Sequence, residues 1–179
     1  ATAVARRVGR AVPAGGGGLG GECAWGAPTR YCMDGALRVQ NRGALGIVRA
    51  DLDAIAGRLA GLAREHRDTV MAGRSHLQQA LPVTFGYKAA VWLSGIERHR
   101  QRLTELRPRA TLVQFGGAAG TLASLGADGF AVQEGLADEL GLGRPDITWH
   151  VMRDNVVELA TFLDPQTVPE GKRVALGGR

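Results

Sequence analysis

A histidine flanked by polar residues makes residues 73–86 the segment best suited to chemistry, and the run reads Gly-Arg-Ser-His-Leu-Gln-Gln-Ala-Leu-Pro-Val-Thr-Phe-Gly. The ordinary imidazole pKa of about 6.5 suits His76 to proton transfer near neutral pH. Ser75 and Gln78 can hydrogen-bond a carboxylate, and Arg74 can supply positive charge. The alternative interpretation is that these polar groups only cap helix ends and satisfy the backbone of a connecting loop.

The other histidines and the cysteines do not indicate a metal centre. His66 ends a predicted helix, where a cation favours the helix dipole, and His99 lies on a predicted packing face. His150 remains open between a core role and a site role. Four scattered histidines do not have the spacing of zinc ligands. Cys23 and Cys32 are expected to be free thiols in a reducing compartment, and the protein is therefore expected to be cytoplasmic.

A long helix is predicted before the histidine segment, from Asp34 as the N-cap to about His66. Its apolar side chains recur in alternating steps of three and four, which is typical of a bundle helix roughly 50 Å long. They are Leu45, Val48, Leu52, Ile55, Leu59 and Leu62. Interior glycines at Gly43, Gly46, Gly57 and Gly61 each cost about 1 kcal/mol relative to alanine. We expect close approach of neighbouring helices to offset this cost.

A polar break over residues 68–82 separates this helix from a second one, predicted over residues 83–106. The second helix is expected to end before Pro108, because the residue before proline resists helical geometry. Its apolar face comprises Trp92, Ile96, His99, Leu103 and Leu106. Shorter helices are predicted over residues 129–140, closed by Gly141, and over 154–162. No alternating strand pattern is visible, so the predicted fold class is all-α, an incomplete bundle of long helices.

Composition narrows the possible partners. Hydrophobic residues make up 45% of the 179, which indicates a globular core, and no run is long enough to span a membrane. The formal net charge is +5, but the arginines alternate with acidic residues along the helices, unlike a nucleic-acid-binding face. The excess charge also suits a small polyanionic substrate.

The run over residues 73–86 resembles the second conserved segment of the fumarase/aspartase superfamily, Gly-Arg-Thr-His-x-Gln-x-Ala-x-Pro-x-Thr-x-Gly. Eight of its nine fixed positions agree, and Ser75 replaces the threonine. Residues 88–126 are similar to sequences in the branch of 3-carboxy-cis,cis-muconate cycloisomerases. The sequence around Trp149-His150 and Arg153-Asp154 is similar to the same branch. The resemblance covers about residues 34–160.

This resemblance implies a mostly α-helical homotetramer with active sites built from segments of different subunits, without a metal or an organic cofactor. It implies that His76 is the acid/base residue. The residues it assigns to the substrate are Arg74, Ser75, Gln78, Gly117, Thr121, His150 and Arg153. The small residues from Gly117 to Thr121 would let backbone amides approach the anion; tight helix packing is the alternative. The segment is not a phosphate loop, because it lacks the lysine after the last glycine.

The implied reaction closes 3-carboxy-cis,cis-muconate to carboxymuconolactone, a step of aromatic catabolism in the β-ketoadipate pathway. A carboxylate of the substrate adds to an activated double bond. The enzyme therefore has to position the substrate and deliver one proton. We expect His76 to donate that proton to the carbon next to the new ring bond.

The first conserved segment of the family, His-Trp-Gly-Ala-Thr-Ser-Gln-Asp, is altered here. Ala24 replaces the histidine, residues 29–31 read Thr-Arg-Tyr in place of Ser-Gln-Asp, and Gly35 replaces a later threonine. Two alternatives therefore stay open: a non-catalytic helical assembly protein or degenerate fragment, and another lyase such as adenylosuccinate lyase.

The predicted organisation divides the chain into three parts. Residues 1–33 are a glycine-rich remnant of the N-terminal domain, 34–165 are part of the central helical bundle, and 166–179 are a tail.

Overall fold

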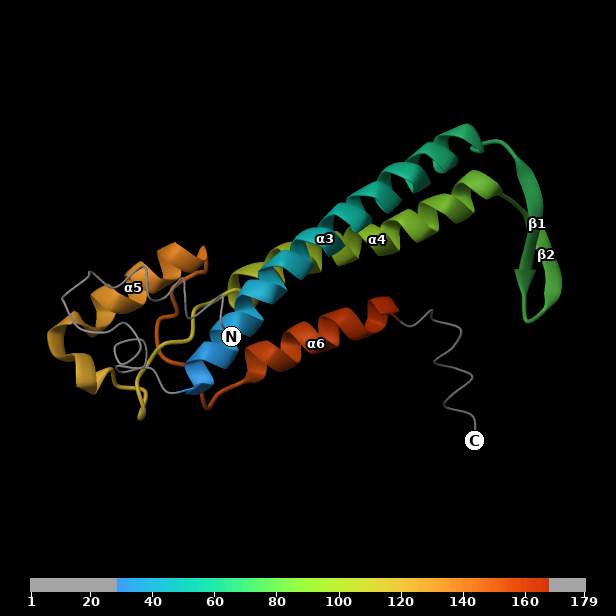
Figure 1. The fold of residues 1–179 in the computed structure, drawn as a ribbon. Helices are drawn as coiled ribbons and strands as arrows, with labels where there is room; N and C mark the ends of the chain where they lie inside the picture. The colour runs from blue at the N-terminus through green and yellow to red at the C-terminus, as the bar shows by residue number, and fades with distance from the viewer. Residues whose placement is uncertain (1–28, 168–179) are drawn as a thin grey trace. The chain divides into compact units, whose positions relative to one another are not determined.

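The computed structural model describes residues 29–167, most of which are helical, and this confirms the predicted all-α fold class apart from one hairpin (Figure 1). The elements in chain order are α3 (Thr29–Glu65), β1 (Val70–Ser75), β2 (Gln78–Thr84), α4 (Phe85–Ala110), the 3-10 helix η1 (Ala123–Asp128), α5 (Gly129–Leu140) and α6 (Asp154–Thr167). Most of the predicted N-terminal remnant and of the predicted tail lies outside the described residues. The predicted three-part division stays a prediction.

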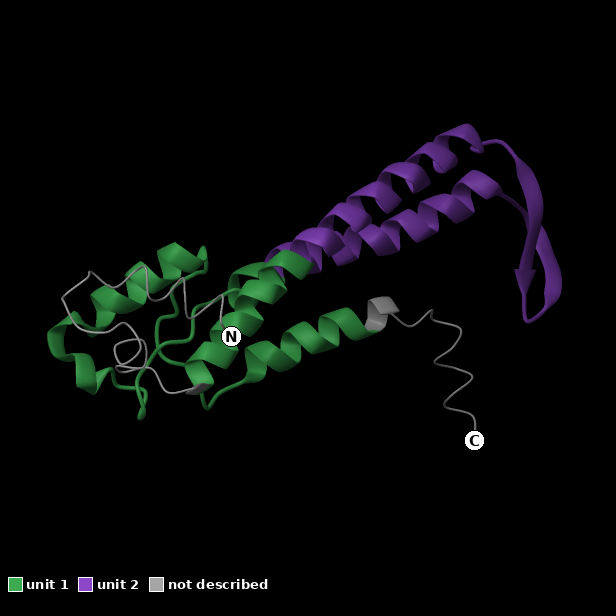
Figure 2. Cartoon of the chain, in the orientation of Figure 1, with its two compact units in different colours: residues 1–44, 106–179 green, residues 45–105 purple. Residues whose placement is uncertain are grey.

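The chain divides into two compact units (Figure 2). Unit 1 comprises residues 1–44 and 106–179, and unit 2 comprises residues 45–105. No helix in the described part of the chain is both long and apolar enough to cross a membrane.

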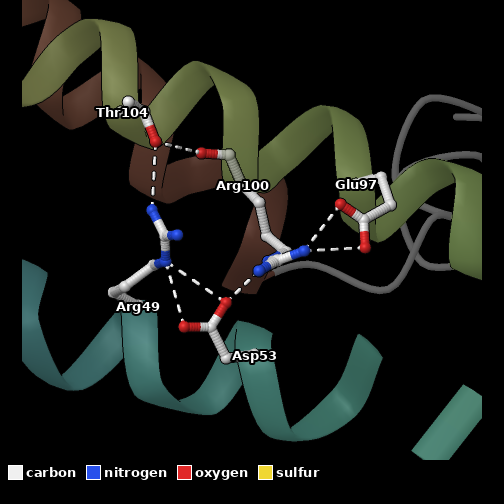
Figure 3. A network of polar contacts seen from close by, with 5 residues as sticks. All are labelled: Arg49, Asp53, Glu97, Arg100 and Thr104. Carbon is white, nitrogen blue, oxygen red and sulfur yellow. Dashed lines mark hydrogen bonds and ion pairs between the residues drawn. The ribbon is translucent and has the colours of Figure 1, made fainter. Parts of the chain in front are cut away.

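In unit 2, the last part of α3 lies beside the first part of α4, and the β1–β2 hairpin joins them (Figure 1). A polar network fastens the two helices together (Figure 3). The Asp53 carboxylate accepts from Arg49 Nε at 3.1 Å and from Arg100 Nε at 2.6 Å. Arg100 also pairs with Glu97 at 2.7 Å, and Arg49 Nη1 donates to Thr104 Oγ1 at 3.0 Å. Because the carboxylate and both guanidinium groups share partners, the entropy lost when each side chain is ordered is offset by more than one contact.

The apolar stripes of unit 2 are only partly covered. Leu45, Leu52 and Leu103 are buried, whereas Ile55 is 43% and Trp92 is 49% exposed. The glycines Gly43, Gly46, Gly57 and Gly61 of α3 have no neighbouring atom within 4 Å of an added Cβ. The close approach of other helices, expected from those glycines, is therefore not provided by the described part of the chain.

The predicted loop over residues 68–82 is wrong, because the chain forms an antiparallel hairpin there. The strands place most of their side chains in solvent, so they lack the alternating apolar pattern that marks a half-buried strand. Their turn also lacks the Asn-Gly or Asp-Gly pair that signals a two-residue hairpin. Pairing is aided by Gly73, since a Cβ there would lie 2.4 Å from the Leu81 carbonyl oxygen.

Two predicted helix boundaries are also wrong. The first helix starts at Thr29, so Asp34 is not an N-cap; its carboxylate is bound by Arg153 within unit 1. The second helix spans Phe85–Ala110 and includes Pro108 in its last turn. A proline there interrupts few helical bonds, and the Thr111 hydroxyl donates to the Arg107 carbonyl at 2.8 Å.

In unit 1, α5 has the predicted bounds, and Gly141 ends it in the left-handed conformation with φ 60°. The Leu142 amide donates to the Ala137 carbonyl at 2.9 Å, which closes the helix in a Schellman-type cap. A small core gathers beneath this helix from Val113, Ala137, Leu140 and Leu142. The fourth helix, α6, extends to Thr167, five residues beyond the predicted end.

A buried arginine occupies the interior of unit 1. Arg38 is 0% exposed and donates to the Ala110 carbonyl and to Asn155 Oδ1, both at 2.9 Å. Its guanidinium carbon lies 4.3 Å from the centroid of the Trp149 ring. Burial lowers the pKa of Arg38, and the neighbouring Asp34 opposes that shift. The side chain thus links three segments that are distant in sequence.

Candidate functional site

The predicted acid/base residue lies at the tip of the hairpin in unit 2. Ser75 pairs with Gln78 across the hairpin, so His76 and Leu77 form a two-residue turn. Both have positive φ angles, 47° and 63°. Hairpin turns of this kind favour asparagine and glycine, and a leucine there is strained by roughly 1–2 kcal/mol. His76 itself is exposed at this turn.

The polar side chains at the tip divide between the two faces of the hairpin. Ser75 and Gln78 are directly opposite each other and therefore share one face, while Arg74 lies on the other. These three residues and His76 are all exposed. Within residues 29–167, none of their side chains has a hydrogen-bond partner, so they are available to an external molecule.

The glycine segment of unit 1 forms a tight loop. Gly117 and Gly120 have φ angles of 74° and 83°, which favour glycine. The Gly120 amide donates to the Gly117 carbonyl at 3.3 Å, and the Leu122 amide donates to the Gly116 carbonyl at 2.8 Å. The exposed Thr121 completes the loop. The glycines thus permit a tightly turned backbone, and both the anion-site role of this segment and tight packing stay open.

His150 lies directly against this loop. A Cβ added at Gly120 would be 2.7 Å from His150 Cε1 and 2.7 Å from Thr148 Cγ2. The His150 Nδ1 and the Thr148 hydroxyl are 3.1 Å apart and share a hydrogen bond. His150 is half-buried. Gly117, Thr121 and His150, predicted together from the sequence, therefore belong to one cluster.

Arg153, predicted to contact the substrate, forms an ion pair with Asp34 within unit 1. Its two Nη atoms donate to the two carboxylate oxygens of Asp34, at 2.7 and 3.0 Å, and Asp34 is buried. The hydrogen bond to Asp34 raises the pKa of Arg153. Because a carboxylate of the chain already occupies its guanidinium, Arg153 is better suited to holding the start of α6 against α3 than to binding substrate.

Tyr31 is a member of the loop cluster that was not predicted from the sequence. Its hydroxyl donates to the Gly117 carbonyl, and its ring centroid lies 6.3 Å from that of His150. Burial raises the pKa of Tyr31, and a hydrogen bond with the side chain of Thr148 opposes this shift in part. The only sequence feature that drew attention to Tyr31 was its place in the altered first conserved segment of the family. That feature indicated a loss of polar groups and did not indicate a new contact.

The candidate residues therefore form two groups. The hairpin group lies in unit 2 and the loop group in unit 1. A shallow pocket of about 440 Å³ on unit 2 belongs to neither; it is lined by the arginines of the network in Figure 3 together with Ser94, Arg98 and Gln101. Within the described residues, no cluster of histidine, cysteine and acidic side chains could hold a metal ion.

Comparison with known proteins places the chain in a family, since residues 23–165 match the family described as Lyase. The chain belongs to this lyase family. The match confirms the resemblance to the fumarase/aspartase superfamily.

Several relatives are similar over most of the chain. A 3-carboxy-cis,cis-muconate cycloisomerase from Pseudomonas aeruginosa is 50% identical over 138 residues, which are 77% of this chain and 30% of that protein. Trans-aconitate decarboxylase 1 from Mycosarcoma maydis is 47% identical over 146 residues, 82% of this chain and 30% of that protein. A crystal structure of fumarate lyase from Mesorhizobium sp. BNC1 has a TM-score of 0.77 and 55% identity, covering 82% of this chain and 35% of that one. The chain spans about a third of the length of the curated relatives that it matches.

Proposed function

We propose that this chain carries the acid/base hairpin and a carboxylate-binding loop of an enzyme that acts on a small unsaturated polycarboxylate. Within that class, the proposed reaction is closure of 3-carboxy-cis,cis-muconate to carboxymuconolactone. The observation that carries the proposal is the exposed imidazole of His76 on a strained two-residue turn, inside the family motif. Strained backbone at an exposed polar side chain is typical of functional sites.

The two relatives support the substrate class. The names of the bacterial and fungal proteins refer to 3-carboxy-cis,cis-muconate and to trans-aconitate. Both compounds carry three carboxylates around carbon–carbon double bonds. An enzyme for such a molecule needs several anion contacts and one group that exchanges a proton with carbon. The loop of unit 1 and the hairpin of unit 2 offer these two capabilities.

The proposed chemistry assigns a task to each group. One carboxylate oxygen of the substrate attacks a double-bond carbon, and the electron pair of that bond takes a proton at the adjacent carbon. His76 in its protonated form donates this proton and is left neutral. Ser75 and Gln78, on one face of the hairpin, hold a carboxylate, and amides of the Gly117–Thr121 loop other than that of Gly120 hold another. We include in this proposal a homotetramer in which different subunits contribute the two groups.

An ultraviolet assay of the purified chain tests the proposal. We expect loss of the 3-carboxy-cis,cis-muconate absorbance, and a loss of rate of at least about 100-fold in His76→Ala, because general acid catalysis contributes about 10²–10⁴-fold. Trans-aconitate and adenylosuccinate serve as alternative substrates in the same assay. Turnover of either one in place of 3-carboxymuconate would replace the proposed reaction by another lyase reaction.

A second candidate function is a non-catalytic helical assembly protein. The half-exposed side chains of Ile55 and Trp92, together with the open glycines of α3, favour it, because such faces are suited to packing against further helices. Light scattering separates the candidates when combined with the assay. An assembled chain that turns over none of the three substrates would support the assembly protein and contradict the enzyme.

A further inference from the structure

Tyr31 stands where the conserved first segment of the family has its aspartate, and it makes a contact that an aspartate could not make in the same way. The side chain is 6% exposed, and its ring centroid lies 6.2 Å from the ring of Phe115. A buried tyrosine needs a hydrogen-bond acceptor for its hydroxyl. Here the acceptor is the carbonyl of Gly117, the first left-handed glycine of the loop.

The same carbonyl oxygen accepts a second hydrogen bond, from the Gly120 amide. Two donors from different directions fix the plane of the peptide bond between Gly117 and Ala118. In a trans peptide bond the carbonyl and the following amide point in opposite directions. Because the Gly117 carbonyl is held towards Tyr31, the amide of Ala118 is directed away from Tyr31. Within the described part of the chain, that amide has no acceptor.

The opposite end of the loop is held as well. The His150 ring and Thr148 lie so close to Gly120 that no side chain fits there. The loop is therefore fastened at Gly117 through Tyr31 and at Gly120 through His150. Between these two points lie Ala118 and Ala119, which are exposed. Such a short, doubly fastened stretch of backbone presents its amides in a fixed direction, as an anion-binding concavity requires.

We propose that Tyr31 is a positioning residue for carboxylate recognition, acting through the Gly117 carbonyl to direct the Ala118 amide at the bound anion. The identity of the anion as a carboxylate rests on the proposed function. A purely structural role would consist of filling the space beside Phe115. Tyr31→Phe separates the two roles, because it keeps the ring and removes only the hydroxyl. Tyr87→Phe is the matched control, since Tyr87 is exposed on α4 in unit 2.

The experiment measures hydrogen exchange and ligand binding on the full chain by amide-resolved NMR, with trans-aconitate as the probe. In Tyr31→Phe we expect the Gly120 amide to exchange several-fold faster, while the amides of α5 exchange as in the wild type. Trans-aconitate should shift the Ala118 amide resonance, with an affinity about two- to tenfold weaker in Tyr31→Phe, as expected for loss of one hydrogen bond. Tyr87→Phe should match the wild type in both measurements.

The two measurements distinguish failure of this inference from failure of the proposed function. If trans-aconitate binds the wild type and Tyr31→Phe equally well, the positioning role is wrong although the substrate class survives. If the wild type does not bind the probe, the carboxylate assignment fails, and faster Gly120 exchange in Tyr31→Phe would still support control of the loop. Unchanged exchange at Gly120 would overturn the role of Tyr31 in either case.

Discussion

Replacing Arg38 by methionine should destabilise unit 1 substantially. The guanidinium is completely buried and makes two hydrogen bonds of 2.9 Å, to Ala110 and Asn155. Hydrogen bonds from a charged donor contribute about 1.5–3 kcal/mol each. The stacking of the guanidinium on Trp149 adds up to about 2 kcal/mol when the pair is desolvated.

The cost of burying the charge opposes these contributions. Removing a guanidinium from water costs several kcal/mol, and Arg38 Nε has no partner within the described residues. Methionine avoids this cost but leaves the Ala110 carbonyl and the Asn155 side-chain oxygen without a donor. Leaving a buried neutral acceptor without its donor costs about 1–3 kcal/mol each. We therefore expect the free energy of unfolding to fall by about 3 kcal/mol.

Urea unfolding followed by far-ultraviolet circular dichroism measures this change. Arg58→Met is the matched control, because Arg58 is exposed on the same helix, and its effect should stay within about 0.5 kcal/mol. Adding Asn155→Leu to Arg38→Met should recover part of the loss, since it removes one of the stranded acceptors. If Arg38→Met is as stable as the wild type, the burial cost cancels the contacts and the reasoning is refuted.

Three further predictions concern unit 2. Asp53→Asn removes the carboxylate shared by two arginines, so the melting temperature should fall in low salt, less so in high salt, while Asp51→Asn changes little; equal effects would contradict the network. Gly86→Ala should destabilise the protein by about 1–3 kcal/mol, because the added Cβ would lie 2.7 Å from two backbone oxygens. Gly57→Ala should stabilise it by up to about 1 kcal/mol, because the added Cβ meets no neighbour and alanine has the higher helix propensity. Calorimetry that gives the reverse order would refute this description of the packing. Burial, with two neighbouring arginines, lowers the pKa of His99 in the folded state below its unfolded value of about 6.5. The contribution of neutral His99 to the free energy of unfolding should therefore be fully present above pH 6.5 and should be lost as the pH falls towards the lower folded pKa. Urea midpoints of His99→Gln should lack this pH dependence.

The long helices were predictable because their signals are local. Apolar residues in steps of three and four mark α3 and α4, and Gly141 marks the end of α5. The boundaries were less predictable where a distant partner decides them. Asp34 has the residue type of an N-cap, but its carboxylate binds Arg153, 119 positions away. No local pattern reports such a partner.

The candidate site was predictable in its residue types and only partly in its geometry. The motif identified His76, yet the hairpin that carries it is mostly solvent-exposed and so lacks the alternating apolar pattern of a half-buried strand. The contact of Tyr31 with Gly117 spans 86 positions, and a tyrosine in place of an aspartate indicated only a missing charge. Pairing at that distance depends on how α3 packs within unit 1, which sequence spacing does not specify.

The most direct test of the central claim compares two single substitutions in the same two-residue turn. His76→Asn keeps a residue that tolerates a positive φ angle and removes the proton donor, whereas Leu77→Gly relieves the backbone strain and keeps the imidazole. Initial rates of 3-carboxy-cis,cis-muconate loss should fall at least about 100-fold in His76→Asn and less than about tenfold in Leu77→Gly. Near-wild-type turnover in His76→Asn would contradict the assignment of His76 as the proton donor.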